Sequence, residues 1–149
     1  MDRKACLTKE SQSQLLAMLR NVPLFSGLKD KHLKTVAAGG KELSYPPGKV
    51  IVEEGAMGVG FFLILDGKVR VRKGKRTLAE LKSGDFFGEM SLFDEKPRSA
   101  TVEALTDTKC LGITAWSFIG MVRSDPDIAV NLMKELVARL RLSDKALAE

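Results

Sequence analysis

Residues 61–72 read FFLILDGKVRVR, an apolar run followed by a segment in which basic residues alternate with valines. Alternation with a period of two is typical of a β-strand with one buried face, so Val69 and Val71 are predicted to point into a core. Asp66-Gly67 separates the two runs, and this dipeptide favours a type I′ turn, which requires positive φ. The stretch therefore predicts a two-residue β-hairpin centred on Asp66-Gly67.

Further short strands are predicted on both sides of this stretch, near residues 49–52 and 108–113. Turn residues interrupt the segment at short intervals, at 46–48 (Pro-Pro-Gly), at Gly74 and at 83–85 (Ser-Gly-Asp). Short strands with closely spaced turns are the mark of a compact antiparallel barrel or sandwich. Residues 41–113 are therefore predicted to form an all-β core.

Helices are predicted on either side of the β segment. The apolar spacing indicates a helix over residues 9–20, with Thr8 as N-cap and Pro23 beyond its end, and a second helix over 30–38. A short helix is predicted at 115–122, and Asp125-Pro126 then opens a long helix that runs nearly to Glu149, with Asp125 as N-cap. The fold class is therefore α+β, a single domain over residues 1–149 with N-terminal helices at about 8–40 and C-terminal helices at 115–149.

Residues of the long helix, all apolar except Ser143, recur in alternating steps of four and three. The positions are Ala129, Met133, Leu136, Leu140, Ser143 and Leu147. This spacing is that of a coiled-coil seam, so a homodimer paired through the C-terminal helix is expected. The alternative is a helix packed on its own barrel.

The composition excludes several classes of protein. The 149 residues are 44% hydrophobic and 29% charged, with no apolar segment of membrane-spanning length and no signal peptide, so a cytoplasmic protein without a membrane contact is expected. Cys6 and Cys110 lie far apart and are predicted to be reduced thiols, with no metal site. The single histidine, His32, is predicted to lie on a helix surface, and most His-dependent catalytic triads are excluded.

Residues 84–102, GDFFGEMSLFDEKPRSATV, contain the candidate binding residues. Gly88 and Glu89 are predicted to open a single helical turn, whose first amides attract an anion. Gly88 allows close approach of a ligand, Glu89 offers a carboxylate to hydroxyls, and Arg98 supplies a guanidinium. A phosphate joined to a sugar diol would use all three.

This segment resembles the phosphate-binding cassette of the cyclic-nucleotide-binding domain family, and most closely that of the bacterial catabolite-activator type of regulator. The similarity lies in FGEMSLF (87–93), in PRSATV (97–102) and in the turn glycines Gly55, Gly67 and Gly84, and it extends from about Leu24 to the end of the chain. The resemblance implies a jelly roll, or double-stranded β-helix, that binds a cyclic nucleotide and signals through its C-terminal helix.

Residue by residue, the resemblance implies that Arg98 pairs with the exocyclic oxygens of the cyclic phosphate and that Glu89 accepts from the ribose 2′-hydroxyl. The amides near Ser91 and Ser99, with the Ser99 hydroxyl, would complete the phosphate cradle. Arg139 and Ser143 match the positions that contact the base. The implied ligand-binding set is Gly88, Glu89, Met90, Ser91, Arg98, Ser99, Ala100, Arg139 and Ser143.

The resemblance to cAMP regulators, with a hydroxyl at Ser143, favours cAMP as the ligand. Ser99 stands where cGMP-selective relatives often carry threonine, so cGMP is the less favoured alternative, and a cyclic dinucleotide is a further one. No metal cofactor is expected.

Three other functions are weighed against a nucleotide sensor. The basic residues of 68–76 suggest nucleic-acid binding, but a solvated hairpin face explains them and no aromatic residue stands among them to stack bases. Relatives of this type usually carry a helix-turn-helix after the long helix, whereas this chain stops at Glu149, so it is either a stand-alone module or the sensor half of a transcription regulator. A nucleotide-free scaffold is disfavoured because the cassette keeps Glu89 and Arg98; the alternative for Arg98 is a surface ion pair with Asp94 or Glu95. An enzyme is disfavoured because the chain has one histidine and no clustered carboxylates.

Overall fold

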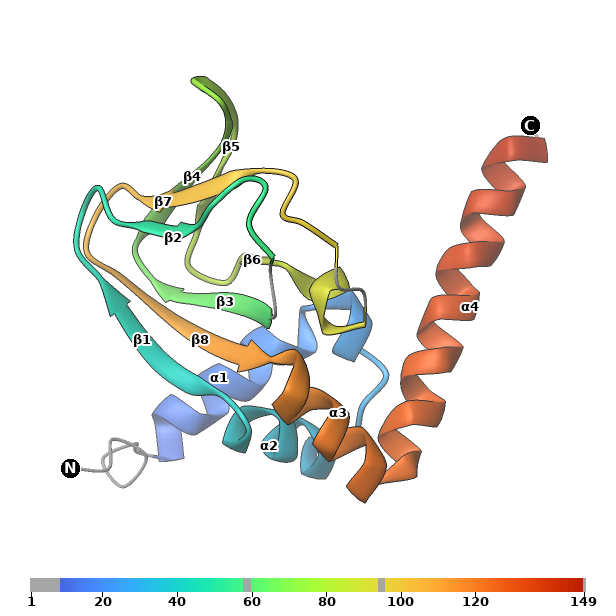
Figure 1. The fold of residues 1–149 in the computed structure, drawn as a ribbon. Helices are drawn as coiled ribbons and strands as arrows, with labels where there is room; N and C mark the ends of the chain where they lie inside the picture. Colours follow the sequence, from blue (N-terminus) through green and yellow to red (C-terminus); the bar gives the residue numbers. More distant parts are fainter. Residues whose placement is uncertain (1–8, 58–59, 94–95, 149) are drawn as a thin grey trace. The chain divides into compact units, whose positions relative to one another are not determined.

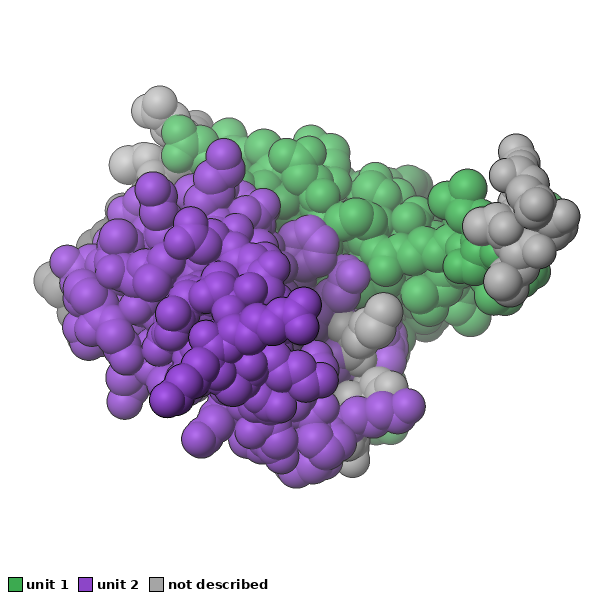
Figure 2. Space-filling view, turned by 90° about the horizontal axis from the view of Figure 1, so that it is seen from above, with its two compact units in different colours: residues 1–37, 121–149 green, residues 38–120 purple. Residues whose placement is uncertain are grey.

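The computed structural model describes residues 9–57, 60–93 and 96–148. Contacts within the chain divide it into two compact units, shown in green and purple in Figure 2. Unit 1 comprises residues 1–37 and 121–149, and unit 2 comprises residues 38–120. Among the described residues, none of the helices combines the length and the apolarity that crossing a membrane requires.

Unit 2 is built from two four-stranded sheets in which all neighbouring strands run antiparallel (Figure 1). The first sheet has the order β1 (Lys41–Tyr45), β8 (Thr108–Thr114), β3 (Gly60–Asp66), β6 (Phe86–Phe87). The second has the order β2 (Val50–Val52), β7 (Thr101–Ala104), β4 (Lys68–Lys73), β5 (Arg76–Lys82). The prediction of an α+β fold with a jelly-roll core is confirmed, and the described strands form two open sheets rather than one closed barrel.

Side chains of both sheets make the core of unit 2. Its fully buried members are Ile64 of β3, Val69 of β4, Val102 of β7 and Cys110 of β8. Val71 is half-buried and packs against this cluster, so the valines that alternate with basic residues on β4 do face inward as predicted. Burial raises the pKa of the Cys110 thiol to about 11.

The predicted hairpin at Asp66-Gly67 is wrong. β3 belongs to the first sheet and β4 to the second, so the chain changes sheets at Gly67 instead of turning back beside itself. Gly67 does have a positive φ of 102°, but Asp66 does not, which excludes a type I′ turn. A Cβ atom at Gly67 would lie 2.5 Å from the Asp107 carbonyl oxygen, so glycine is needed where the link between β3 and β4 passes close to the link between β7 and β8. The neighbouring hairpin joins β4 to β5, with Lys73 paired to Arg76 around Gly74.

The helices lie close to their predicted bounds. They are α1 (Lys9–Arg20), the 3-10 helix η2 (Pro23–Phe25), α2 (Asp30–Ala38), α3 (Ala115–Ser124) and α4 (Pro126–Ala148). In unit 1, η2 packs against both α1 and α4. Asp125 caps α4 as predicted, because its Oδ1 accepts a hydrogen bond of 3.2 Å from the Asp127 amide. The predicted N-cap at Thr8 and the predicted reduced thiol of Cys6 lie outside the described residues.

His32 was predicted to lie on a helix surface, and this is wrong. Its side chain is only 2% exposed, and it shares the buried face of α2 with Leu33 and Val36. His32 and Val36 are one helical turn apart, so the apolar face of the short helix includes the histidine. By contrast, Met133, Leu136 and Leu140 of the predicted seam on α4 are exposed in the single chain.

Candidate functional site

The cassette of residues 84–102 joins the two sheets of unit 2, running from β6 to β7. β6 is held against β3, where Phe87 pairs with Phe62 and the two rings stack at 5.0 Å between centroids. The helical turn predicted after Gly88 is present as the 3-10 helix η3 (Glu89–Leu92), in which the Ser91 amide donates to the Gly88 carbonyl. Leu92 at its end is buried and anchors the turn.

Gly88 has a positive φ of 81°, a conformation that other residues rarely adopt. A Cβ atom at this position would lie 2.6 Å from the Gly60 carbonyl oxygen and would collide with the guanidinium of Arg98. The glycine therefore serves two needs, the turn of the backbone and the close approach of the Arg98 side chain.

Arg98 is brought to the same place from the far end of the cassette. Its Nη2 donates a hydrogen bond of 2.6 Å to the Gly60 carbonyl, and its Nε is buried with no hydrogen-bond partner among the described residues. Burial lowers the pKa of the guanidinium, which as an arginine still remains charged near neutral pH. A half-buried guanidinium with a buried, unused donor has the charge and the hydrogen-bonding capacity to hold an anion.

The backbone of Arg98 is fixed from both sides by the turn that follows β2. Its amide donates to the Ala56 carbonyl, and its carbonyl accepts from the Gly55 amide, each at 2.8 Å. Met57 and Pro97 form a further antiparallel bridge next to this pair. The guanidinium is thus carried on a backbone held at two points, which limits how far it can move.

Arg98 lines a cavity of about 520 Å³ that lies within unit 2. The wall is largely apolar, with side chains from both sheets. The lining residues are Gly39, Lys41, Leu43, Ile51, Val52, Glu53, Ala56, Met57, Gly60, Phe61, Phe62, Arg98, Gly112, Ile113, Thr114 and Ser117. An apolar cavity of a few hundred cubic ångströms with a few convergent polar groups is the usual form of a small-molecule site.

Several of these lining residues were missed by the sequence analysis. Lys41 and Glu53 add one charge of each sign, and Thr114 and Ser117 add hydroxyls. The Ser117 hydroxyl donates to the Gly39 carbonyl, and the Ser117 amide donates to Thr114 Oγ1. These residues come from separate elements and follow no local motif, so only the sheet topology brings them together.

The structure brings some of the predicted residues together and leaves others apart. Gly88 and Arg98 are in contact, and Glu89 has a buried Oε2 at the start of η3. Ser91 and Ala100 are half-buried and Ser99 is exposed. The side chain of Met90 lies outside the described residues.

The two residues predicted to contact the base belong to the other unit. Arg139 and Ser143 lie on α4 in unit 1, one turn apart. Arg139 lies 3.8 Å from Glu135 as an ion pair along the helix, and Ser143 is exposed. The structure therefore does not place either residue in the cavity of unit 2.

A two-sheet roll with an arginine-bearing cassette beside an apolar cavity defines a small-molecule binding module for an anionic ligand. Residues 42–125 match the family model of the cyclic nucleotide-binding domain. The chain belongs to this family.

Named relatives agree with this assignment. The chain is 37% identical over 131 residues to the cyclic AMP receptor protein of Thermus thermophilus, covering 85% of this chain and 61% of the relative. It is 44% identical over 96 residues to a cAMP-dependent protein kinase regulatory subunit of Aspergillus fumigatus, covering 62% of this chain and 23% of the relative. The chain thus spans less than two thirds of the length of these curated relatives.

Among solved structures, the N-terminal domain of a transcriptional regulator from Streptomyces coelicolor matches with a TM-score of 0.81 and 30% identity. This match covers 87% of this chain and 93% of that one. The similar proteins are cyclic nucleotide-binding regulators, so this chain is a binding domain and not an enzyme.

Proposed function

We propose that this chain is a cAMP sensor that binds the nucleotide in the cavity of unit 2 and signals through α4. The observation that carries the proposal is Arg98, a half-buried guanidinium whose buried Nε donor is unused, in the wall of a largely apolar cavity. A cyclic phosphate carries one negative charge and presents two exocyclic oxygens, which suit a planar guanidinium.

The proposed binding set follows the family cassette. Arg98 pairs with the phosphate and Glu89 accepts a hydrogen bond from the ribose 2′-hydroxyl. Gly88 has no side chain and so allows the ligand to approach the backbone closely. The amides and side chains of Met90, Ser91, Ser99 and Ala100 surround the phosphate. The assignment of Arg139 and Ser143 to the base rests on the family resemblance.

The preference for cAMP over cGMP is supported by the names of the relatives, which are a cyclic AMP receptor protein and cAMP-dependent kinase regulatory subunits. Ser99 is exposed and stands where cGMP-selective relatives often carry a threonine that reaches the guanine amino group; its hydroxyl offers the same kind of contact, so cGMP stays the less favoured alternative.

The output is proposed to pass through α4, with two copies pairing along its exposed seam. Leu136 and Leu140 are 42% and 60% exposed in the single chain, and such a stripe gains free energy when a second helix covers it. We treat residues 1–149 as one domain, since the family match at 42–125 crosses the boundary between the two units. A cytoplasmic location suits a nucleotide made inside cells.

Nucleic-acid binding by the β4–β5 hairpin has weaker support. Arg70 and Arg72 of its basic face both form ion pairs with Glu103 of β7. Two of the basic residues therefore share one carboxylate within the sheet. A helix-turn-helix that follows this segment in a longer protein would make the chain the sensor half of a transcription regulator, with DNA binding supplied elsewhere.

Isothermal titration with cAMP and cGMP tests the proposal, with Arg98→Ala as the key variant and Arg76→Ala as its matched control. Arg76 is an exposed arginine at the start of β5 and does not line the cavity. Losing a buried, hydrogen-bonded charge partner costs about 2–5 kcal/mol, which is roughly a 30-fold to several-thousand-fold loss of affinity. Ser143→Ala removes one neutral hydrogen bond and is expected to cost about 1 kcal/mol.

Tight cAMP binding that Arg98→Ala abolishes and Arg76→Ala leaves intact would establish the sensor function. Failure of well-folded protein to bind either nucleotide would refute it. Equal small losses in Arg98→Ala and Ser143→Ala would contradict the proposed role of Arg98 alone.

A further inference from the structure

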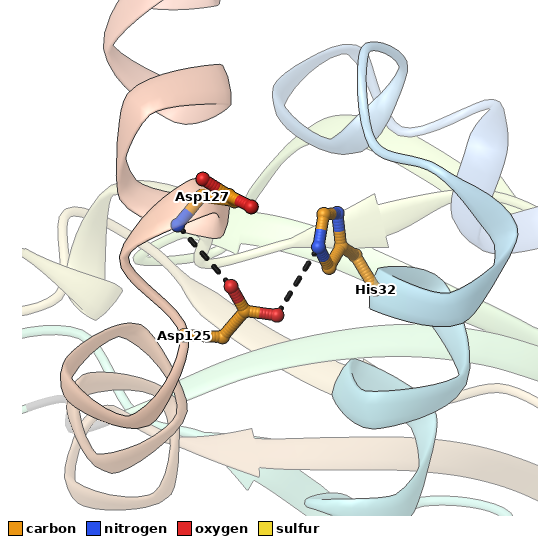
Figure 3. Close-up of side chains that lie close together, drawn as sticks. All are labelled: His32, Asp125 and Asp127. Carbon is orange, nitrogen blue, oxygen red and sulfur yellow. Dashed lines mark hydrogen bonds and ion pairs between the residues drawn. The ribbon is translucent and has the colours of Figure 1, made fainter.

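A second group of chemically capable side chains lies in unit 1, apart from the nucleotide cavity. His32 projects from α2 toward the start of α4, where Asp125 and Asp127 stand (Figure 3). One ligand atom from each of the three residues lies within 4.8 Å of the other two. His32 is buried, Asp125 is half-buried and Asp127 is exposed, so the group has a closed inner side and an open outer side.

The histidine is the unusual member of the group. Its side chain is 2% exposed, yet neither Nδ1 nor Nε2 has a hydrogen-bond partner among the described residues. Nε2 forms an ion-pair contact of 3.1 Å with Asp125 Oδ2, but the contact does not have the geometry of a hydrogen bond. A buried ring nitrogen without a hydrogen bond costs free energy, and a ligand directed at Nε2 would lower that cost.

Asp125 and Asp127 stand at the N-terminus of α4, but helix capping alone does not explain why a carboxylate oxygen of Asp125 faces His32. Asp125 caps α4 with Oδ1, which accepts from the Asp127 amide, and this leaves Oδ2 turned toward His32. Asp127 adds a second carboxylate whose exposed side chain is able to turn toward the other two. The helix cap can therefore persist while Oδ2 takes a further ligand.

The distance between His32 and Asp125 suits two ligands of one metal ion. With metal–ligand bonds of about 2.0–2.2 Å, neighbouring ligands of a tetrahedral site lie roughly 3.3–3.6 Å apart. The distance of 3.1 Å between Nε2 and Oδ2 is close to this value, and the indirect aim of the ring is what two ligands of a shared ion display. One imidazole with two carboxylates suits Zn²⁺ or a related divalent transition metal, with solvent completing the open side.

We propose that His32, Asp125 and Asp127 form a binding site for a divalent transition metal of the Zn²⁺ class, which ties α2 to the first turn of α4. This site is independent of nucleotide binding, because none of its ligands lines the cavity of unit 2. An ion bound there stabilises unit 1 and holds the N-terminus of α4.

The test is titration of the full chain with Zn²⁺ by calorimetry, with thermal unfolding in parallel. One equivalent is expected to bind and, at about a hundred times Kd, to raise the Tm by roughly 5–10 °C. His32→Gln and Asp127→Asn are each expected to weaken binding at least tenfold. Asp144→Asn, the same change at an exposed aspartate further along α4, is the matched control and is expected to bind as the parent does.

Substituting Co²⁺ for Zn²⁺ shows whether the metal binds to a cysteine thiolate or to the proposed site. A cobalt spectrum without a thiolate charge-transfer band is expected, because the proposed ligands are nitrogen and oxygen. Absence of Zn²⁺ binding, a thiolate band, or an affinity unchanged in both His32→Gln and Asp127→Asn would each overturn the proposal. Asp127 is exposed, so Asp127→Asn keeps the test valid even where His32→Gln unfolds the chain.

Discussion

Gly88 and Arg98 depend on each other at the scale of single residues. The guanidinium occupies the space that any side chain at position 88 would need, and Gly60 supplies the carbonyl that both approach. The sequence motif could predict that both residues matter, but it could not predict this contact, because Gly60 lies on β3, remote from the cassette in sequence.

Gly88→Ala is expected to lose both stability and ligand affinity. A left-handed conformation costs a non-glycine residue about 1–2 kcal/mol, and the new Cβ also meets the Gly60 carbonyl and pushes the Arg98 guanidinium aside. Urea unfolding and calorimetry with cAMP measure the two losses.

Gly48→Ala is the matched control for this substitution. Gly48 has a φ of 85°, close to the 81° of Gly88, but a Cβ there would meet no atom within 4 Å. It should therefore show the conformational cost alone and keep its affinity. Equal behaviour of the two variants would show that the contact with Arg98 is unimportant.

Cys110 makes the stability of the chain depend on pH at the alkaline end. Burial raises the pKa of its thiol from 9.0 to about 11, so the folded state holds the proton more tightly than the unfolded state does. The stabilisation is complete below pH 9 and is lost as the pH rises toward 11. We expect the urea midpoint to fall more steeply across this interval in the parent than in Cys110→Ala. Parallel curves for the two proteins would contradict this account.

At the scale of secondary-structure elements, sequence patterns located the helices and strands well but failed at the connection between β3 and β4. Alternating Val69 and Val71 identified β4, and Asp125-Pro126 identified the start of α4, because these signals are local. Asp66-Gly67 indicated a hairpin, and the structure does require a glycine at position 67, but not for a hairpin turn. The reason for that glycine, the nearby Asp107 carbonyl, lies in a distant loop that no local pattern reveals.

The seam of α4 predicts a self-association that one substitution should weaken. Leu140→Glu places a charge in the centre of the proposed helix pair, where it would have to be buried. Because Leu140 is 60% exposed in the single chain, the fold itself should tolerate the change. Analytical ultracentrifugation is expected to show a dissociation constant raised by at least tenfold.

Leu142→Glu provides the control for the helix pair. Leu142 is 69% exposed on the same helix but stands outside the seam positions, so the same substitution should leave the association unchanged. A parent chain that is monomeric at high concentration would exclude pairing through α4.

At the scale of the whole molecule, the family and the jelly roll could be predicted from sequence, whereas the cavity could not. The cassette motif is a continuous segment of 19 residues, 84–102, and it identified Arg98 directly. Lys41, Glu53 and Ser117 reach the same cavity from three different segments, and only the order of strands in the two sheets places them together. His32 was misplaced for a similar reason, since its burial depends on packing within unit 1.

Signalling through α4 requires that the ligand have different affinities for two arrangements of the chain, because a ligand with equal affinity for both shifts neither. Hydrogen exchange measured with and without cAMP tests this requirement, and protection is expected to change over residues 136–143 of α4 as well as over the cassette. The cassette serves as the internal control, since binding alone should protect the amides of Met90, Ser91, Ser99 and Ala100, which are proposed to surround the phosphate. Protection confined to the cassette would refute switching through α4 while leaving nucleotide binding intact. Arg98→Ala should remove both changes together, because without the proposed phosphate contact little nucleotide binds and no binding free energy is left to shift the helix.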